Sequence, residues 1–225
     1  MLMNETVFFL HALIVVGFLI LATRLGKMAL YCFVAIQGIL ANLFVLKQMK
    51  LFGLVVTCAD VYTISCIFGI NIICEFFGKK EANKAILLSL FLVIFYLIMT
   101  KFHLFYIPIS NENFSVSYET ILSTAPRIVL SSILVFYVVQ RIDVLFFSFL
   151  KRKVFKDSFL LRLTCSVLLT QFLDTFLFSF LGLYGTVQKI FQVITMSYLM
   201  KVVIIAFNSS FCSFLKRFIK QVEAK

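Results

Sequence analysis

Long apolar segments alternate with short polar or basic connections along the whole chain. The segments are 16 to 26 residues long, around the roughly 20 residues that a helix needs to cross the hydrocarbon core of a bilayer. The segments cover approximately residues 7–22, 29–46, 52–77, 85–100, 126–150, 159–181 and 187–212. This pattern predicts an all-α, polytopic membrane protein with seven transmembrane helices in a single integral-membrane domain, residues 1–225. A six-helix version, which loses the first segment or merges two others, is the alternative.

The longest polar connection, residues 101–125, contains Pro108 and the turn-forming sequence SNEN. We expect it to be an external loop with a short interfacial helix. The glycines at 182 and 185 indicate a turn after the sixth segment. Composition supports the membrane prediction, because 62% of the residues are hydrophobic and the mean hydropathy is +1.07. Soluble domains contain roughly 45–50% apolar residues, so a soluble globule is excluded.

The net charge of +11 is distributed unevenly between the two sides of the predicted bundle. With seven helices, the connections and tail on one side hold thirteen Lys and Arg residues, and those on the other side hold four. Cytoplasmic connections of membrane proteins are enriched in Lys and Arg. The asymmetry therefore predicts an N-terminus outside and a C-terminus in the cytoplasm, and it explains the basic charge without a nucleic-acid partner.

The six cysteines lie at positions 32, 58, 66, 74, 165 and 212, with no C-x-x-C and no metal-ligand spacing. We interpret them as small apolar side chains within helices. The chain also lacks the glycine-rich motif that binds nucleotide phosphates. We therefore expect no metal, no cofactor and no catalytic residues.

A repeated sequence contributes the most unusual polar residues. Residues 140–150 and 171–181 both fit Q-x-x-D-x-x-x-F-S-F-L. Each Gln and Asp pair lies three residues apart and so shares one helix face, inside an apolar segment where a carboxylate is costly and is a functional candidate. At 1.5 Å per residue, Asp143 lies roughly 12 Å and Asp174 roughly 22 Å from the inner end, with Gln140 and Gln171 near the midplane. Two copies on antiparallel helices predict a substrate site at the midplane, as in transporters built from repeats.

Other polar residues within the segments are further candidates. Lys201 lies near the midplane of the last segment, and Asn42 is one of two strongly polar residues in the second. Weaker candidates are Asp60, Asn71, Glu75 and Tyr198. A structural alternative remains open for all of them, because buried Gln and Asp also join membrane helices through hydrogen bonds. For Lys201, an ion pair with Asp174 or Asp143 is as consistent with the sequence as a substrate contact.

Several short stretches, in this order and spacing, resemble the queuosine precursor transporters of the vitamin-uptake type. They are LANLFVLKQ (40–48), N-x-x-x-E-F-F-G-K-K-E-A (71–82), APRIVLSS (125–132), the two Q-x-x-D motifs and Tyr198-x-x-Lys201. The resemblance covers about residues 38–210. The chain departs from the family pattern at Asn71, where Asp is usual, at Ile64, where Pro is frequent, and at Ser209–Ser210, in place of Thr-Pro.

The resemblance implies a multi-pass protein of the bacterial inner membrane that imports a 7-deazaguanine base (preQ0, preQ1 or queuine) for salvage into modified tRNA. A carboxylate accepts the two adjacent N–H groups of a guanine-like edge, while Gln or Lys donates to its carbonyl. We therefore expect Asp143 or Asp174 to bind this edge, with Gln140, Gln171, Asn42 and Lys201 completing the site.

The expected partners are the base and membrane lipid, with a homo-oligomer or an external energising module as further candidates. Two alternatives to autonomous transport remain. The chain could be the substrate-capturing subunit of an energy-coupled vitamin importer. It could also be an intramembrane enzyme that uses Asp143 and Asp174, although catalytic aspartates must lie close enough to share a proton. The depths above separate them by roughly 10 Å, which disfavours this reading.

Overall fold

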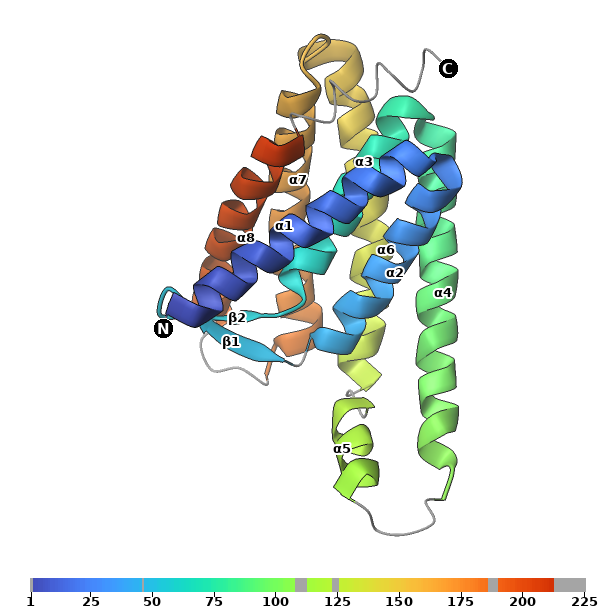
Figure 1. Ribbon diagram of the computed structural model, residues 1–225, viewed down its shortest axis with the longest axis vertical. Coiled ribbons are helices and arrows are strands. Elements are labelled where there is room, and N and C mark those ends of the chain that lie inside the picture. The colour runs from blue at the N-terminus through green and yellow to red at the C-terminus, as the bar shows by residue number, and fades with distance from the viewer. Residues whose placement is uncertain (1, 46, 108–112, 123–125, 186–189, 213–225) are drawn as a thin grey trace.

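The computed structural model describes residues 2–45, 47–107, 113–122, 126–185 and 190–212 (Figure 1). Its elements in chain order are α1 (Leu2–Leu25), α2 (Lys27–Phe44), β1 (Gln48–Leu51), β2 (Leu54–Thr57), α3 (Asp60–Phe76), α4 (Lys79–Phe105), α5 (Asn113–Leu122), α6 (Pro126–Phe149), a π-helical turn (Leu150–Val154), α7 (Phe159–Phe178), a second π-helical turn (Ser179–Leu183) and α8 (Ile190–Cys212). The predicted class, a polytopic helical membrane protein, is confirmed.

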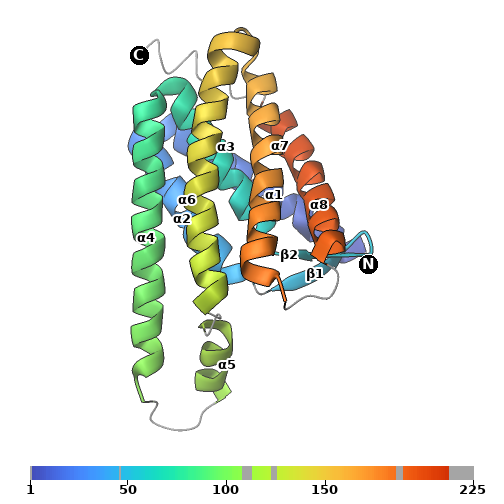
Figure 2. The ribbon, with the colours of Figure 1, turned by 180° about the vertical axis from the view of Figure 1, so that it is seen from behind.

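Six helices within the described residues are long and apolar enough to cross a membrane, namely α1, α2, α4, α6, α7 and α8. In Figure 2, α4, α6, α7 and α8 stand side by side, in agreement with the contacts between successive members of this row. The remaining long helix, α3, has 17 residues. Its length of about 25 Å is less than the roughly 30 Å of a hydrocarbon core, so the total of seven crossings stays a prediction.

The third apolar segment does not begin as a helix at residue 52. Residues 48–57 instead form a hairpin in which β1 and β2 pair antiparallel and Leu51 faces Leu54. The two turn residues, Phe52 and Gly53, both have positive φ, 50° and 81°, the conformation that a two-residue hairpin requires. The valines and threonine of β2 favour a strand because their β-branched side chains suit an extended backbone. Asn4 and Glu5 of α1 bond to backbone atoms of the hairpin.

Helix α3 lies at the centre of the bundle and contacts α1, α2, α4, α6, α7 and α8. Thirteen of its 17 residues are buried, including every position from Ile64 to Cys74. Gly69 allows α2 to approach closely, since a Cβ atom there would lie 2.7 Å from Cγ2 of Val34. Small residues at such crossings are typical of membrane helix pairs.

The two ends of the bundle differ in charge. The α1–α2, α3–α4 and α6–α7 connections gather at one end, at the top of Figure 1, and the hairpin and α5 lie at the other. We call the end with the three connections the basic end, because these connections and the helix ends beside them hold nine basic residues. They are Arg24, Lys27, Lys79, Lys80, Lys84, Lys151, Arg152, Lys153 and Lys156. This grouping agrees with the predicted cytoplasmic side, and the orientation itself stays a prediction. The basic tail from Lys216 to Lys225 lies outside the described residues.

The connection of residues 101–125 contains the short helix that the sequence predicted, α5. Helix α4 continues to Phe105, five residues beyond its expected end, and extends with α5 past the rest of the bundle (Figure 1). Pro108 and most of the SNEN sequence lie outside the described residues.

Candidate functional site

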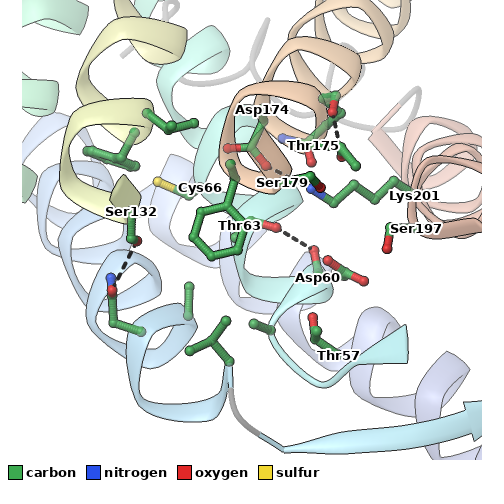
Figure 3. Close-up of a pocket in the computed structure, with 18 of the residues that line it drawn as sticks. Thr57, Asp60, Thr63, Cys66, Ser132, Asp174, Thr175, Ser179, Ser197 and Lys201 are labelled. Carbon is green, nitrogen blue, oxygen red and sulfur yellow. Dashed lines mark hydrogen bonds and ion pairs between the residues drawn. The ribbon is translucent and has the colours of Figure 1, made fainter. Parts of the chain in front are cut away.

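A cavity of about 580 Å³ lies inside the bundle, between α2, α3, α6, α7 and α8, and Leu90 and Val93 of α4 also contribute to its wall. Its size is typical of small-molecule sites. The wall extends from the hairpin to the middle of the bundle, and among the described residues none from the connections at the basic end contributes to it. Its polar side chains are Gln37, Asn42, Gln48, Thr57, Asp60, Thr63, Ser132, Gln140, Gln171, Asp174, Thr175, Ser179, Gln192, Ser197 and Lys201. Figure 3 labels Thr57, Asp60, Thr63, Ser132, Asp174, Thr175, Ser179, Ser197 and Lys201 among them.

Three buried glutamines lie in this wall, each from a different helix. Gln37 of α2 is 4% exposed, Gln140 of α6 is 3% exposed and Gln171 of α7 is 1% exposed. Within the described residues, the Oε1 atoms of all three and Nε2 of Gln171 have no hydrogen-bond partner. An unpartnered buried amide costs about 1–3 kcal/mol, so these side chains hold hydrogen-bonding capacity that the fold does not use.

An ionic cluster occupies another part of the wall. Nζ of Lys201, from α8, lies 2.8 Å from Oδ2 of Asp174, from α7. Asp60, in the first turn of α3, lies close to this pair and next to Thr57. Figure 3 shows Asp60, Asp174 and Lys201 facing the same part of the cavity. The ion pair between Lys201 and Asp174 that the sequence left open is therefore present.

Asp143 does not belong to the cavity wall, which differs from the predicted site. Its carboxylate accepts hydrogen bonds from Ser166 at 2.5 Å and from Thr170 at 3.3 Å, both on α7. Asn71 of α3 lies beside it. The reason is helical geometry: Asp143 is nearly one turn closer to the basic end than Gln140 and is rotated by about 60° from it. The side chain therefore points into the α6–α7 contact, on the side of the cavity that faces the basic end.

The weaker candidates Glu75 and Tyr198 also lie outside the cavity wall. Glu75 forms an ion pair with buried Arg162 at 2.8 Å and another with Lys151 at 3.3 Å, at the basic end. The Tyr198 hydroxyl donates to the carbonyl of Leu168 at 3.2 Å. Both side chains therefore connect helices, in agreement with the structural alternative.

Asn42 lines the cavity, and its Oδ1 accepts a hydrogen bond from Ser132 of α6 at 3.1 Å. Its role as a substrate ligand stays a prediction. The sequence-based prediction of the site did not include Gln37, although Gln37 and Asn42 are the two strongly polar residues of the second segment. Ser132, Thr63 and Ser197 gave no usable signal, because Ser and Thr occur throughout membrane helices. Phe136 and Phe178 add aromatic faces to the wall.

Asp143 and Asp174 hold different partners, the first Ser166 and the second Lys201, so they do not form a catalytic pair that shares a proton. Among the described residues, no group of three or more His, Cys, Asp or Glu could hold a metal ion. A bundle of membrane helices around a central cavity, with polar side chains set in a largely apolar wall, fits a transporter. The class of protein defined by fold and site is thus a multi-pass membrane transporter.

Comparison with known families agrees with this class and makes it specific. Residues 57–215 match the family described as "Putative vitamin uptake transporter", and the chain belongs to this family. It is 33% identical over 163 residues to a protein of Bacillus subtilis (strain 168) named "Probable queuosine precursor transporter", with 71% of each chain covered. No solved structure matches the chain.

Family membership confirms that the protein is a transporter of the membrane and not an enzyme. The predicted localisation, a multi-pass protein of the bacterial inner membrane, agrees with the bacterial relative and with the six apolar helices. The matched range begins at the end of β2. Gln37 and Asn42 of α2 therefore line the cavity but lie outside the range that the family model matches.

Proposed function

We propose that this protein imports a 7-deazaguanine base (preQ0, preQ1 or queuine) for salvage into modified tRNA, and that the base binds in the cavity between α2, α3, α6, α7 and α8. The name of the Bacillus subtilis relative supports the substrate class. The observation that carries the proposal is the group of three buried glutamines, Gln37, Gln140 and Gln171, whose amides have atoms without a partner among the described residues.

A carboxamide suits the edge of a guanine-like base because it offers one acceptor and two donors in a plane. The edge presents adjacent N–H donors and a carbonyl acceptor, so each glutamine can accept from one group and donate to its neighbour. Phe136 and Phe178 of the wall supply apolar faces for the flat ring. In this proposal the glutamines bind the edge, and Asp143 holds α6 against α7 instead of contacting the base.

The direction of access follows from the shape of the wall. The lining extends from the hairpin, through Gln48 and Thr57, to Gln140 and Gln171 at mid-bundle. If the basic end is cytoplasmic, the hairpin end faces outside. The structure then represents the conformation that receives the base from outside, and release requires the helices to separate at the basic end.

The test is queuosine in the tRNA of a bacterial host that can neither synthesise nor import its precursors. The host expresses this protein and receives each of the three bases separately. We expect queuosine to appear with at least one base, and an empty vector is the control. Queuosine that stays absent with all three bases, with the protein present in the membrane, refutes the proposal.

The energised-importer alternative is tested by comparing uptake in this host with uptake by the purified protein in liposomes. Uptake of labelled base by the protein alone excludes an obligatory energising partner. Uptake in cells but not in liposomes, with base binding retained, supports a substrate-capturing subunit.

A further inference from the structure

The ionic cluster in the cavity wall carries two carboxylates and one ammonium. Lys201 and Asp174 form an ion pair at 2.8 Å. Asp60 forms none of the ion pairs found among the described residues, although it is only 8% exposed. Its polar neighbours are the Thr57 hydroxyl, the Lys201 ammonium and the Asp174 carboxylate, and Lys201 already binds Asp174. The cluster therefore has a net charge of −1 when all three groups are ionised.

A buried carboxylate without its own counter-charge is costly, because transfer from water into a low-dielectric interior removes its hydration. The position of Asp60 in the first turn of α3 offsets part of this cost, since the helix N-terminus carries a partial positive charge of about half a unit. The part of the carboxylate charge that the helix N-terminus does not balance gives the cavity wall a negative potential. A cation that enters the cavity beside Asp60 would be stabilised there.

We propose that Asp60 holds a protonated amine on the substrate, so that the transporter selects amine-bearing 7-deazaguanines over the nitrile. This inference rests on the proposed function and concerns the part of the base opposite to the guanine-like edge. The three candidate bases share that edge, so Gln37, Gln140 and Gln171 cannot distinguish them. They differ in the substituent on the five-membered ring.

The substituents differ in charge. PreQ1 carries an aminomethyl group and queuine a secondary amine, and an alkylamine is a cation at neutral pH, as the lysine side chain is. PreQ0 carries a nitrile, which is neutral and can only accept a hydrogen bond. The nitrile therefore gains nothing from Asp60, while an ammonium gains a charge-assisted hydrogen bond. Repulsion between the substrate ammonium and Lys201 is weakened, because Asp174 forms an ion pair with Lys201 at 2.8 Å.

The experiment compares labelled preQ1 and preQ0, each measured for binding to the purified wild-type protein and for uptake by cells. We expect wild type to prefer preQ1 by at least tenfold. Asp60→Asn keeps the size of the side chain and one acceptor oxygen, but it removes the charge and replaces the other oxygen by an NH2 donor. We therefore expect preQ1 affinity to fall to the level of preQ0 while preQ0 binding stays within about twofold. Asp60→Glu, which retains the charge, is the matched control and should keep a preference for preQ1.

Equal affinity of wild type for the two bases, or a preference for preQ0, overturns the inference, and this comparison needs no variant that might fail to fold. An unchanged preQ1 preference in Asp60→Asn also overturns it. Failure of the proposed function looks different, because wild type would then bind and import none of the three bases.

Discussion

The glutamines of the cavity wall allow a test that separates a substrate site from a structural clamp. Gln171 is 1% exposed, and neither atom of its amide has a hydrogen-bond partner within the described part of the chain. Replacing it by Met, which has a similar length and volume, removes an unsatisfied buried amide. Because such an amide costs about 1–3 kcal/mol, we expect the thermal stability of Gln171→Met without ligand to stay constant or rise.

Substrate binding should change in the opposite direction. A well-aligned pair of hydrogen bonds to a base edge contributes about 1–3 kcal/mol of discrimination. Since 1.4 kcal/mol corresponds to a factor of ten, the affinity of Gln171→Met for the base should fall by roughly 5- to 150-fold. A clamp would give the reverse result, with lower stability and unchanged affinity.

The assay combines two measurements on protein purified in detergent: the melting temperature without ligand and the dissociation constant for labelled base. Ser166→Ala is the contrasting variant, because the hydroxyl of Ser166 donates to Asp143 at 2.5 Å and neither residue lines the cavity. It should lose about 1–3 kcal/mol of stability, since the carboxylate is left with fewer partners, with little change in affinity. A Gln171→Met protein that melts several degrees lower and binds the base normally would refute the reasoning.

Two further predictions concern the packing that holds the site. Glu75→Gln leaves Arg162, which is 3% exposed, without its carboxylate partner, so unfolding should become easier by about 3–5 kcal/mol. Thermal unfolding measures this, and a stability loss under 1 kcal/mol would contradict it. Gly69→Ala places a Cβ atom 2.7 Å from Val34 and should cost about 1–3 kcal/mol. Addition of Val34→Ala should recover part of that loss, and additive losses would argue against the close α2–α3 contact.

Several features were already determined by the sequence, because they depend on local composition and on the bilayer. Apolar segments of about 20 residues predict membrane helices wherever they occur, and the helical membrane architecture followed from them. The repeated Q-x-x-D motif led to Gln140, Gln171 and Asp174, which all line the cavity. The concentration of Lys and Arg in alternate connections agrees with their grouping at one end of the bundle.

Only the tertiary structure decided which way each polar side chain faces. The repeat treats Asp143 and Asp174 as equivalent, yet one points into the α6–α7 contact and the other pairs with Lys201 in the cavity wall. The rotation of a helix about its axis depends on contacts with its neighbours, such as the close approach at Gly69, and no local pattern specifies those contacts. The hairpin also depends on contacts that no local pattern specifies. Residues 52–57 are as apolar as a membrane helix, but they form a turn and a strand because β2 pairs with β1. Phe52 and Gly53 adopt the positive φ values that this turn requires.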